Sequence, residues 1–196
     1  MKIEVSQATT SIEFRNISVQ TKSVEQAGAI CIRKRKGQAE AEVLLIVSRR
    51  NGRWGIPKGH VDPGETSRDT ARREAFEEAG VKGDVLEQTV GSFTYRKDGT
   101  SIQYLVAVHV LHVTRLSKDF PEKDIRNIKW VPISSASREV AQTGLRQILK
   151  NLFNHTEPPS TDGRARPTDL AMPWDFNEED MDENLGQHST FTTKFR

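Results

Sequence analysis

The chain has 196 residues, of which 35% are hydrophobic, and a mean hydropathy of −0.63. This length suits one domain with residues left over for tails. No stretch approaches the roughly 18 consecutive apolar residues of a membrane helix, and the N-terminal segment lacks the apolar core of a signal peptide. We therefore expect a cytoplasmic protein with no membrane partner. The single cysteine, Cys31, excludes an internal disulfide, and its apolar neighbours predict a core residue.

The formal net charge of +2 at pH 7 hides an asymmetry between two parts of the chain. Residues 156–196 contain nine Asp or Glu and four Lys or Arg, which leaves residues 1–155 at +7. A basic body favours a polyanionic ligand, which is either nucleic acid or a small molecule with many phosphates. Composition alone leaves both alternatives open.

The first half of the chain predicts a polar arm followed by a β-hairpin. We assign residues 1–26 to the arm, with a weak alternating pattern at residues 12–19 that is typical of an edge strand. Apolar runs predict strands at residues 27–33 and 41–48, separated by a charged turn. Residues 54–59 contain a proline and two glycines, which predict a tight loop rather than a helix.

A helix is predicted over residues 67–79. Thr66, with Asp69 three residues later, has the spacing of a capping box, which satisfies the free N–H groups at a helix start. Gly80 suits the left-handed position that ends many helices.

The remaining elements complete an α/β domain that we place at residues 27–154. Alternating and periodic apolar residues predict strands at residues 88–95, 101–113 and 125–131, and a helix at residues 137–153. Residues 155–196 are rich in Pro, Gly, Asp and Glu, so we expect an acidic, flexible C-terminal tail.

Three carboxylates of the predicted helix carry the clearest chemical signal. Steps of three and four residues place Glu74, Glu77 and Glu78 on one helix face, where they repel one another. A hard divalent cation bound by carboxylate oxygens would neutralise them. A solvated acidic face paired with Arg72 and Arg73 is the alternative.

The residues around these carboxylates distinguish the two interpretations. They fit the pattern Gly-x5-Glu-x7-Arg-Glu-U-x-Glu-Glu-x-Gly-U, where U is a bulky aliphatic residue. Every charged and glycine position of this pattern is matched, by Gly59, Glu65, Arg73, Glu74, Glu77, Glu78 and Gly80. This segment resembles the Nudix box, the metal and phosphate motif of the Nudix hydrolases. Ala75 is the one departure, because the pattern has a larger aliphatic residue there.

The resemblance implies a fold, a cofactor and a reaction. It implies an α/β/α sandwich with a mixed β-sheet and the Nudix loop-helix, in which Glu74, Glu77 and Glu78 bind Mg²⁺, or Mn²⁺ as the alternative ion. The Gly59 carbonyl is a further expected ligand. Glu65, Arg73 and Gly80 would be structural. The three carboxylates would also be catalytic, since the metal activates a water for attack on a diphosphate and Glu74 or Glu78 takes its proton.

Shorter matches indicate the substrate class. The segments at residues 53–59 and 129–132 are similar to those of diphosphoinositol polyphosphate phosphohydrolases and related dinucleoside polyphosphate hydrolases. A polyphosphorylated small molecule needs a basic lining. The candidate substrate-binding residues lie on predicted loops and strand ends: Lys58, Arg33, Arg35, Arg50, Arg53 and Lys97. Ordinary solvated surface charge is the alternative for these residues, and core packing is the alternative to base stacking for Trp54.

Two other functions remain open. A non-catalytic Nudix module could sense a phosphorylated ligand, although such a module has no need of three mutually repelling carboxylates. Hydrolysis of nucleoside triphosphates or RNA 5′ ends would use the same box. The acidic tail disfavours nucleic acid as a partner.

Overall fold

The computed structural model of the protein describes residues 23–97 and 99–156. The predicted strand at residues 12–19 and nearly all of the predicted tail lie outside these ranges. The described elements are β1 (Ser23–Arg33), β2 (Glu42–Val47), β3 (Trp54–Gly55), β4 (Lys58–His60), α1 (Ser67–Ala79), β5 (Val81–Arg96), β6 (Gln103–Leu116), β7 (Ile128–Pro132), α2 (Ile133–Glu139) and α3 (Thr143–Thr156).

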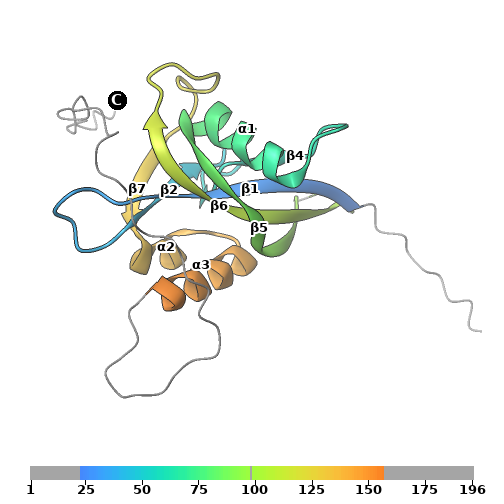
Figure 1. The fold of residues 1–196 in the computed structure, drawn as a ribbon. Coiled ribbons are helices and arrows are strands. Elements are labelled where there is room, and N and C mark those ends of the chain that lie inside the picture. Colours follow the sequence, from blue (N-terminus) through green and yellow to red (C-terminus); the bar gives the residue numbers. More distant parts are fainter. Residues whose placement is uncertain (1–22, 98, 157–196) are drawn as a thin grey trace, which may run out of the picture.

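The strands form one mixed sheet between two layers of helices. Along the main path the strand order is β3-β2-β1-β6-β5, while β4 pairs with β1 and β7 pairs with β2. Only β1 and β6 run parallel, and the other described pairs are antiparallel. Helix α1 lies on one face of the sheet, and α2 with α3 covers the other (Figure 1). The predicted α/β/α sandwich with a mixed sheet is confirmed.

The sheet has a hydrophobic core on each face, and alternate residues of β1 point into one core or the other, as the two-residue repeat of a strand requires. Ala27, Ala29 and Cys31 are fully buried against α1, whereas Ile30 and Ile32 face α2 and α3. Small side chains on the α1 side allow this helix to approach the sheet closely. Ala75 and Cys31 are fully buried there, and burial raises the pKa of the Cys31 thiol.

The predicted limits of α1 are confirmed. The Thr66 side chain accepts the backbone N–H of Asp69, and the Asp69 side chain accepts the N–H of Thr66 in return. Gly80 ends the helix with φ 66°, a left-handed conformation that favours glycine. A Cβ there would lie 2.6 Å from the Phe120 ring, so close packing also requires glycine.

Several predicted elements differ from the structure, and β1 begins at Ser23, inside the predicted arm, rather than at residue 27. The predicted loop at residues 54–59 contains the short strands β3 and β4, and β5 begins directly after Gly80 rather than at residue 88. The single helix predicted over residues 137–153 is wrong, because Val140 is extended and separates α2 from α3. The chain turns there because the N–H of Ala141 donates to the Trp54 carbonyl at 3.1 Å. Within the described ranges, no helix has the length and apolar character needed to cross a membrane.

Candidate metal and phosphate site

The loop before α1 is joined directly to the carboxylates of that helix. Strand β4 pairs with β1, which places Gly59 opposite Ala27. From this position the backbone N–H of Lys58 donates to Oε2 of Glu78 at 2.8 Å. A Cβ on Gly59 would fall on the Glu74 carboxylate, so the close approach of loop and helix requires glycine.

Arg73 connects the start of the loop-helix segment to two of its carboxylates. Its guanidinium makes a bidentate pair with Glu65, with Nε–Oε1 at 2.9 Å and Nη2–Oε2 at 3.0 Å. Its Nη1 donates to Glu74 at 2.7 Å and to Glu77 at 3.2 Å. Nη2 also donates to the His60 carbonyl at 3.0 Å. One arginine therefore contacts the loop backbone, a loop carboxylate and two carboxylates of the helix face.

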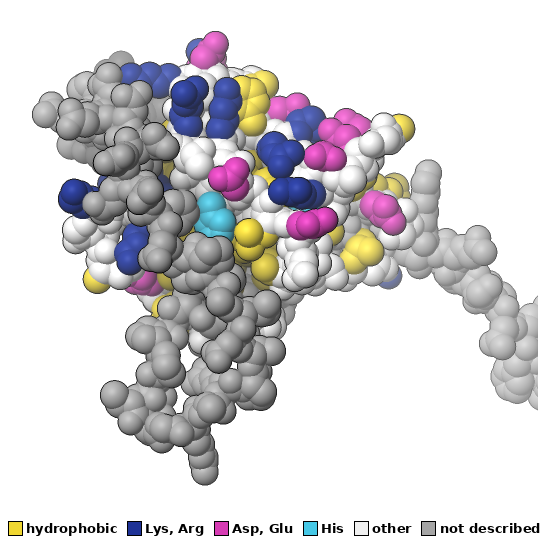
Figure 2. All heavy atoms as spheres, viewed as in Figure 1, with side chains coloured by type: hydrophobic (Ala, Val, Ile, Leu, Met, Phe, Trp, Pro, Cys, Tyr) yellow, Lys and Arg dark blue, Asp and Glu magenta, His cyan; other side chains and the backbone are white. Residues whose placement is uncertain are grey.

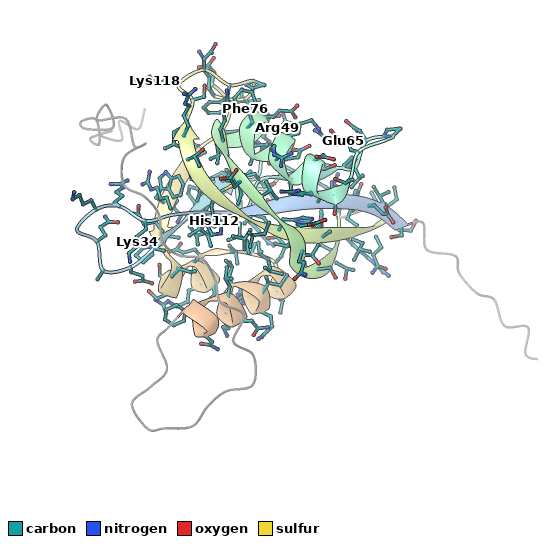
Figure 3. The ribbon with its side chains drawn as sticks, viewed as in Figure 1. Lys34, Arg49, Glu65, Phe76, His112 and Lys118 are labelled. Atoms are coloured by element: carbon teal, nitrogen blue, oxygen red, sulfur yellow. The ribbon has the colours of Figure 1, made fainter. Side chains whose placement is uncertain are left out.

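The pair with Arg73 strongly favours the charged form of Glu65. Hydrogen bonds from Arg73 and then from Thr70 Oγ1, which is 2.7 Å away, lower the pKa of Glu65 to about 2. The hydrogen bond to Glu65 raises the pKa of Arg73, and burial opposes this rise. Figure 3 shows Glu65 at the N-terminal end of α1.

Two of the three helix carboxylates are buried. Glu74 and Glu78 are 8% and 7% exposed, whereas Glu77 is partly exposed. Burial raises the pKa of Glu74, and the hydrogen bond from Arg73 opposes that shift. Buried carboxylates need compensating charge or hydrogen bonds.

That compensation comes partly from a residue that sequence reasoning missed. Arg126 lies at the end of the connection between β6 and β7, and its side chain is 7% exposed. It contacts Glu78 Oε1 and Glu122 Oε2, and its Nη1 donates to the Val47 carbonyl at 3.1 Å. Burial and then Arg49 lower the pKa of Arg126. No local pattern predicts the pair with Glu78, because 48 residues separate the partners.

The carboxylates are suited to a divalent cation, although arginines hold them in this conformation. Among residues 23–97 and 99–156, no three side chains of the metal-binding types converge closely enough to hold an ion. Arg73 contacts Glu74 and Glu77, and Arg126 contacts Glu78. Carboxylate oxygens are the hard donors that Mg²⁺ prefers. Glu74, Glu77 and Glu78 therefore offer the kind of donor set that such a cation takes, and arginines are their present partners.

The sequence matches one known domain family. The model of the NUDIX domain family matches residues 23–152, which is more than half of the chain. The chain belongs to the Nudix family.

Similar proteins include a diphosphoinositol polyphosphate phosphohydrolase and two plant Nudix hydrolases. Diphosphoinositol polyphosphate phosphohydrolase 3-beta of Bos taurus is 36% identical over 115 residues, covering 57% of this chain and 66% of the relative. Nudix hydrolase 21 of Arabidopsis thaliana is 32% identical over 122 residues, and the match covers 62% of this chain and 61% of that protein. The match to Nudix hydrolase 4 of the same plant covers 54% of the relative. The chain thus spans less than two thirds of the length of each of these two plant relatives.

A solved structure has the same architecture. The crystal structure of the C. elegans Ap4A hydrolase has a TM-score of 0.54 and 26% sequence identity to this chain. The superposition covers 69% of this chain and 99% of that one.

Two predicted substrate-binding lysines lie together near the Nudix carboxylates. Lys58 Nζ is 5.3 Å from the centroid of the Tyr95 ring, and Lys97 Nζ is 4.3 Å from that of Tyr104. These two rings stack with their centroids 5.0 Å apart. Partial burial, Lys97 and Arg126 lower the pKa of Lys58, while Glu74 raises it. Lys58 therefore feels the charge of Lys97, which lies beside the aromatic pair, and the charges of Arg126 and Glu74 in the carboxylate site.

The other predicted substrate-binding arginines lie in three different environments. Arg33 is 5% exposed, stacks 3.7 Å from the Trp130 ring and donates to Glu42 at 2.8 Å. The more exposed Arg35 pairs with the same carboxylate at 3.3 Å. Arg33 ends β1 and Arg35 follows it, at the end of the strand remote from Gly28, which pairs with Lys58. The structure therefore does not bring these two arginines to the Nudix loop.

Arg50 and Arg53 lie in the exposed turn before β3. Burial raises the pKa of Tyr95, and the charge of Arg50 opposes this rise. Arg50 therefore acts on the ring that lies beside Lys58. Figure 2 shows basic and acidic side chains interleaved over the face that carries α1. The visible face is therefore mixed in charge rather than uniformly basic.

Trp54 and His109 have structural surroundings. Trp54 packs against the core on the α2 and α3 side, and Lys129 Nζ lies 4.1 Å from its ring centroid. His109 is 1% exposed and bonds to Ser67 Oγ at 2.9 Å and to the Leu86 carbonyl at 3.0 Å. These contacts favour core packing for Trp54 and support of the α1 start for His109.

Proposed function

We propose that the protein is a Mg²⁺-dependent hydrolase that cleaves a diphosphate linkage in a polyphosphorylated small molecule. The observation that carries this proposal is the direct contact between the loop before α1 and the helix itself. Glu78 accepts the N–H of Lys58, and Glu74 fills the space beside Gly59. The metal-binding carboxylates and a phosphate-binding lysine thereby belong to one rigid segment. The related hydrolases named above support the same reaction class.

Glu74, Glu77 and Glu78 would hold the metal. When bound there, Mg²⁺ supplies neutralisation of charge at phosphorus and activation of the attacking water. Glu74 or Glu78 would act as the general base, because these are the buried carboxylates of the face. Arg73 holds the carboxylate of Glu74 in place through its 2.7 Å contact, and the pair with Glu65 keeps Arg73 itself oriented.

The substrate we propose is a dinucleoside polyphosphate or a diphosphoinositol polyphosphate. Lys58 and Lys97 present two cations beside the carboxylates, and Arg50 lies within electrostatic reach of Tyr95. Several positive charges close together suit several phosphates in one ligand. The relatives include a protein named for each substrate: a diphosphoinositol polyphosphate phosphohydrolase and an Ap4A hydrolase.

A substrate panel tests this proposal. Phosphate and nucleotide release would be measured with Mg²⁺ from diadenosine polyphosphates, diphosphoinositol phosphates, nucleoside triphosphates and sugar nucleotides. We expect turnover of one of the first two classes and little turnover of the last two. Preferred hydrolysis of nucleoside triphosphates would overturn the substrate class. Tight binding of a panel member without any turnover would replace the hydrolase by a sensor.

A further inference from the structure

Arg126 occupies an unusual place for a cation in a site that is expected to bind a metal. Its guanidinium lies between Glu78 of α1 and Glu122 of the connection between β6 and β7. Glu74 also contributes an attractive charge at Arg126. The side chain is nearly buried, and with the Val47 carbonyl each of its three nitrogens has an acceptor.

The backbone that carries Arg126 is fixed at several points. The N–H of Ser117 donates to the Gly80 carbonyl at 2.8 Å, and the N–H of Glu122 donates to the Glu77 carbonyl at 3.0 Å. At the other end, the Asn127 carbonyl accepts the N–H of Val47 at 2.9 Å. The connection is therefore attached to α1 at one end and to β2 at the other.

The contacts of Arg126 and those of a metal at Glu78 compete. A guanidinium on Glu78 Oε1 compensates the charge of the buried carboxylate. Glu78 Oε2 already accepts the N–H of Lys58. A divalent cation that binds Glu78 Oε1 would face the positive guanidinium at very short range, so the two cations exclude each other there.

We propose that Arg126 is an internal counter-ion that competes with the metal for Glu78 and thereby sets the metal affinity of the site. The inference rests on the proposed function, because it takes the helix carboxylates as metal ligands. In the metal-free protein Arg126 holds Glu78, and metal binding releases Arg126 from this carboxylate while Glu122 remains a partner for it. The measured affinity is then lower than that of the same carboxylates without the arginine, because part of the binding free energy is spent on breaking the ion pair.

Isothermal titration of the full chain with Mg²⁺ and with Mn²⁺, in the absence of substrate, tests this competition. We expect Arg126→Gln to lower the metal dissociation constant by about tenfold or more, since no cation then occupies Glu78. The metal dissociation constant of Arg126→Lys should lie between those of wild type and Arg126→Gln, because a lysine keeps the charge but lacks the guanidinium fork that spans several acceptors. Arg126→Lys also serves as the second variant if the glutamine variant does not fold.

Arg49→Gln is the matched control. Arg49 is 58% exposed and pairs with Glu122 at 3.4 Å, so the substitution removes the same charge and touches the same loop carboxylate, yet Arg49 has no described bond to Glu78. Its dissociation constant should change by less than about twofold. A change equal to that of Arg126→Gln would mean that only the general field of the site matters, and it would overturn the competition.

Thermal unfolding gives an independent readout. In EDTA, Arg126→Gln should unfold at a lower temperature than wild type, because Glu78 and Glu122 lose their buried counter-ion. Saturating Mg²⁺ should raise the unfolding temperature of the variant by more than that of wild type.

The possible failures are distinguishable. Equal or weaker metal binding by Arg126→Gln and Arg126→Lys, with normal binding by wild type, would overturn the competition and leave the hydrolase proposal standing. No metal binding by wild type or any variant would overturn both.

Discussion

The backbone N–H of Lys58 and the Glu78 carboxylate are 2.8 Å apart, although twenty residues separate them in the chain. This hydrogen bond fixes the position of the Lys58 main chain relative to the carboxylate face of α1 that we propose as the metal site. The side chain of Lys58 extends toward the Tyr95 ring. A phosphate held by Lys58 would therefore have a defined position relative to the carboxylates.

Replacement of Lys58 should weaken substrate binding. We expect Lys58→Met to raise the KM of the preferred polyphosphate substrate by roughly tenfold to hundredfold, because a hydrogen bond to a charged group contributes about 1.5–3 kcal/mol. Steady-state kinetics at two salt concentrations measures this effect, and the salt dependence of KM should become weaker in the variant.

The matched control is Lys34→Met. Lys34 is exposed on the turn between β1 and β2, on the other side of the molecule from Glu65 (Figure 3). The two variants have the same net charge, so equal KM values for both would assign the effect to the general field rather than to a contact by Lys58.

Gly59→Ala should disrupt the close contact between the loop before α1 and Glu74 of that helix. The added Cβ would occupy the place of the Glu74 carboxylate, so either the loop or the carboxylate must move. We expect the free energy of unfolding to fall by about 1–3 kcal/mol, as overpacking commonly produces, together with a loss of turnover. Urea denaturation and the rate on the preferred substrate measure the two effects.

Gly55→Ala provides the comparison for Gly59→Ala. The nearest neighbour of a Cβ at Gly55 is Gln142 Oε1 at 3.5 Å, which is an ordinary contact. Its free energy of unfolding should stay within about 0.5 kcal/mol of wild type. A larger loss at Gly55 than at Gly59 would contradict the close approach to Glu74.

The ion pair between Glu65 and Arg73 should contribute stability that depends on pH. The pKa of Glu65 is about 2 in the folded protein and has an ordinary value of 4.5, so the folded state binds this proton less readily than the unfolded state. The contribution is therefore fully present above pH 4.5 and is lost as the pH falls toward 2. Glu65→Gln should destabilise the protein at about pH 6 and should differ less from wild type at about pH 3.

Urea denaturation at both pH values measures this difference. Glu87→Gln is the control, because Glu87 is exposed on β5 and its substitution removes one carboxyl group without touching Arg73. A gap between wild type and Glu65→Gln that is the same at both pH values would argue against the ion pair as its source.

Features that act within a few residues, such as helix caps, were predictable from the sequence. Features that depend on contacts between distant residues were not. Helix α1 follows from Thr66 and Gly80 because a cap acts within a few residues of the helix end. The break between α2 and α3 depends on a bond from Ala141 to Trp54, which no periodic pattern contains.

The same distinction applies to the site residues. The spacing of Glu74, Glu77 and Glu78 follows from helix geometry, so their shared face was predictable. Arg33 matched the basic pattern of a substrate lining, yet its buried contacts with Trp130 and Glu42 arise from sheet pairing. Arg126 lies 48 residues from Glu78, and only the folded chain shows that the two meet.

The most direct test of metal-dependent hydrolysis is the initial rate of product release from the preferred substrate as a function of Mg²⁺ concentration, for wild type and Glu78→Gln. Circular dichroism and thermal unfolding would first show that both proteins are folded. We predict that wild type is inactive in EDTA and saturates with Mg²⁺, and that Glu78→Gln remains at least about 100-fold slower at saturating metal. Wild-type turnover that persists in EDTA, or equal rates for the two proteins, would contradict the assignment of this carboxylate face as the metal and catalytic site.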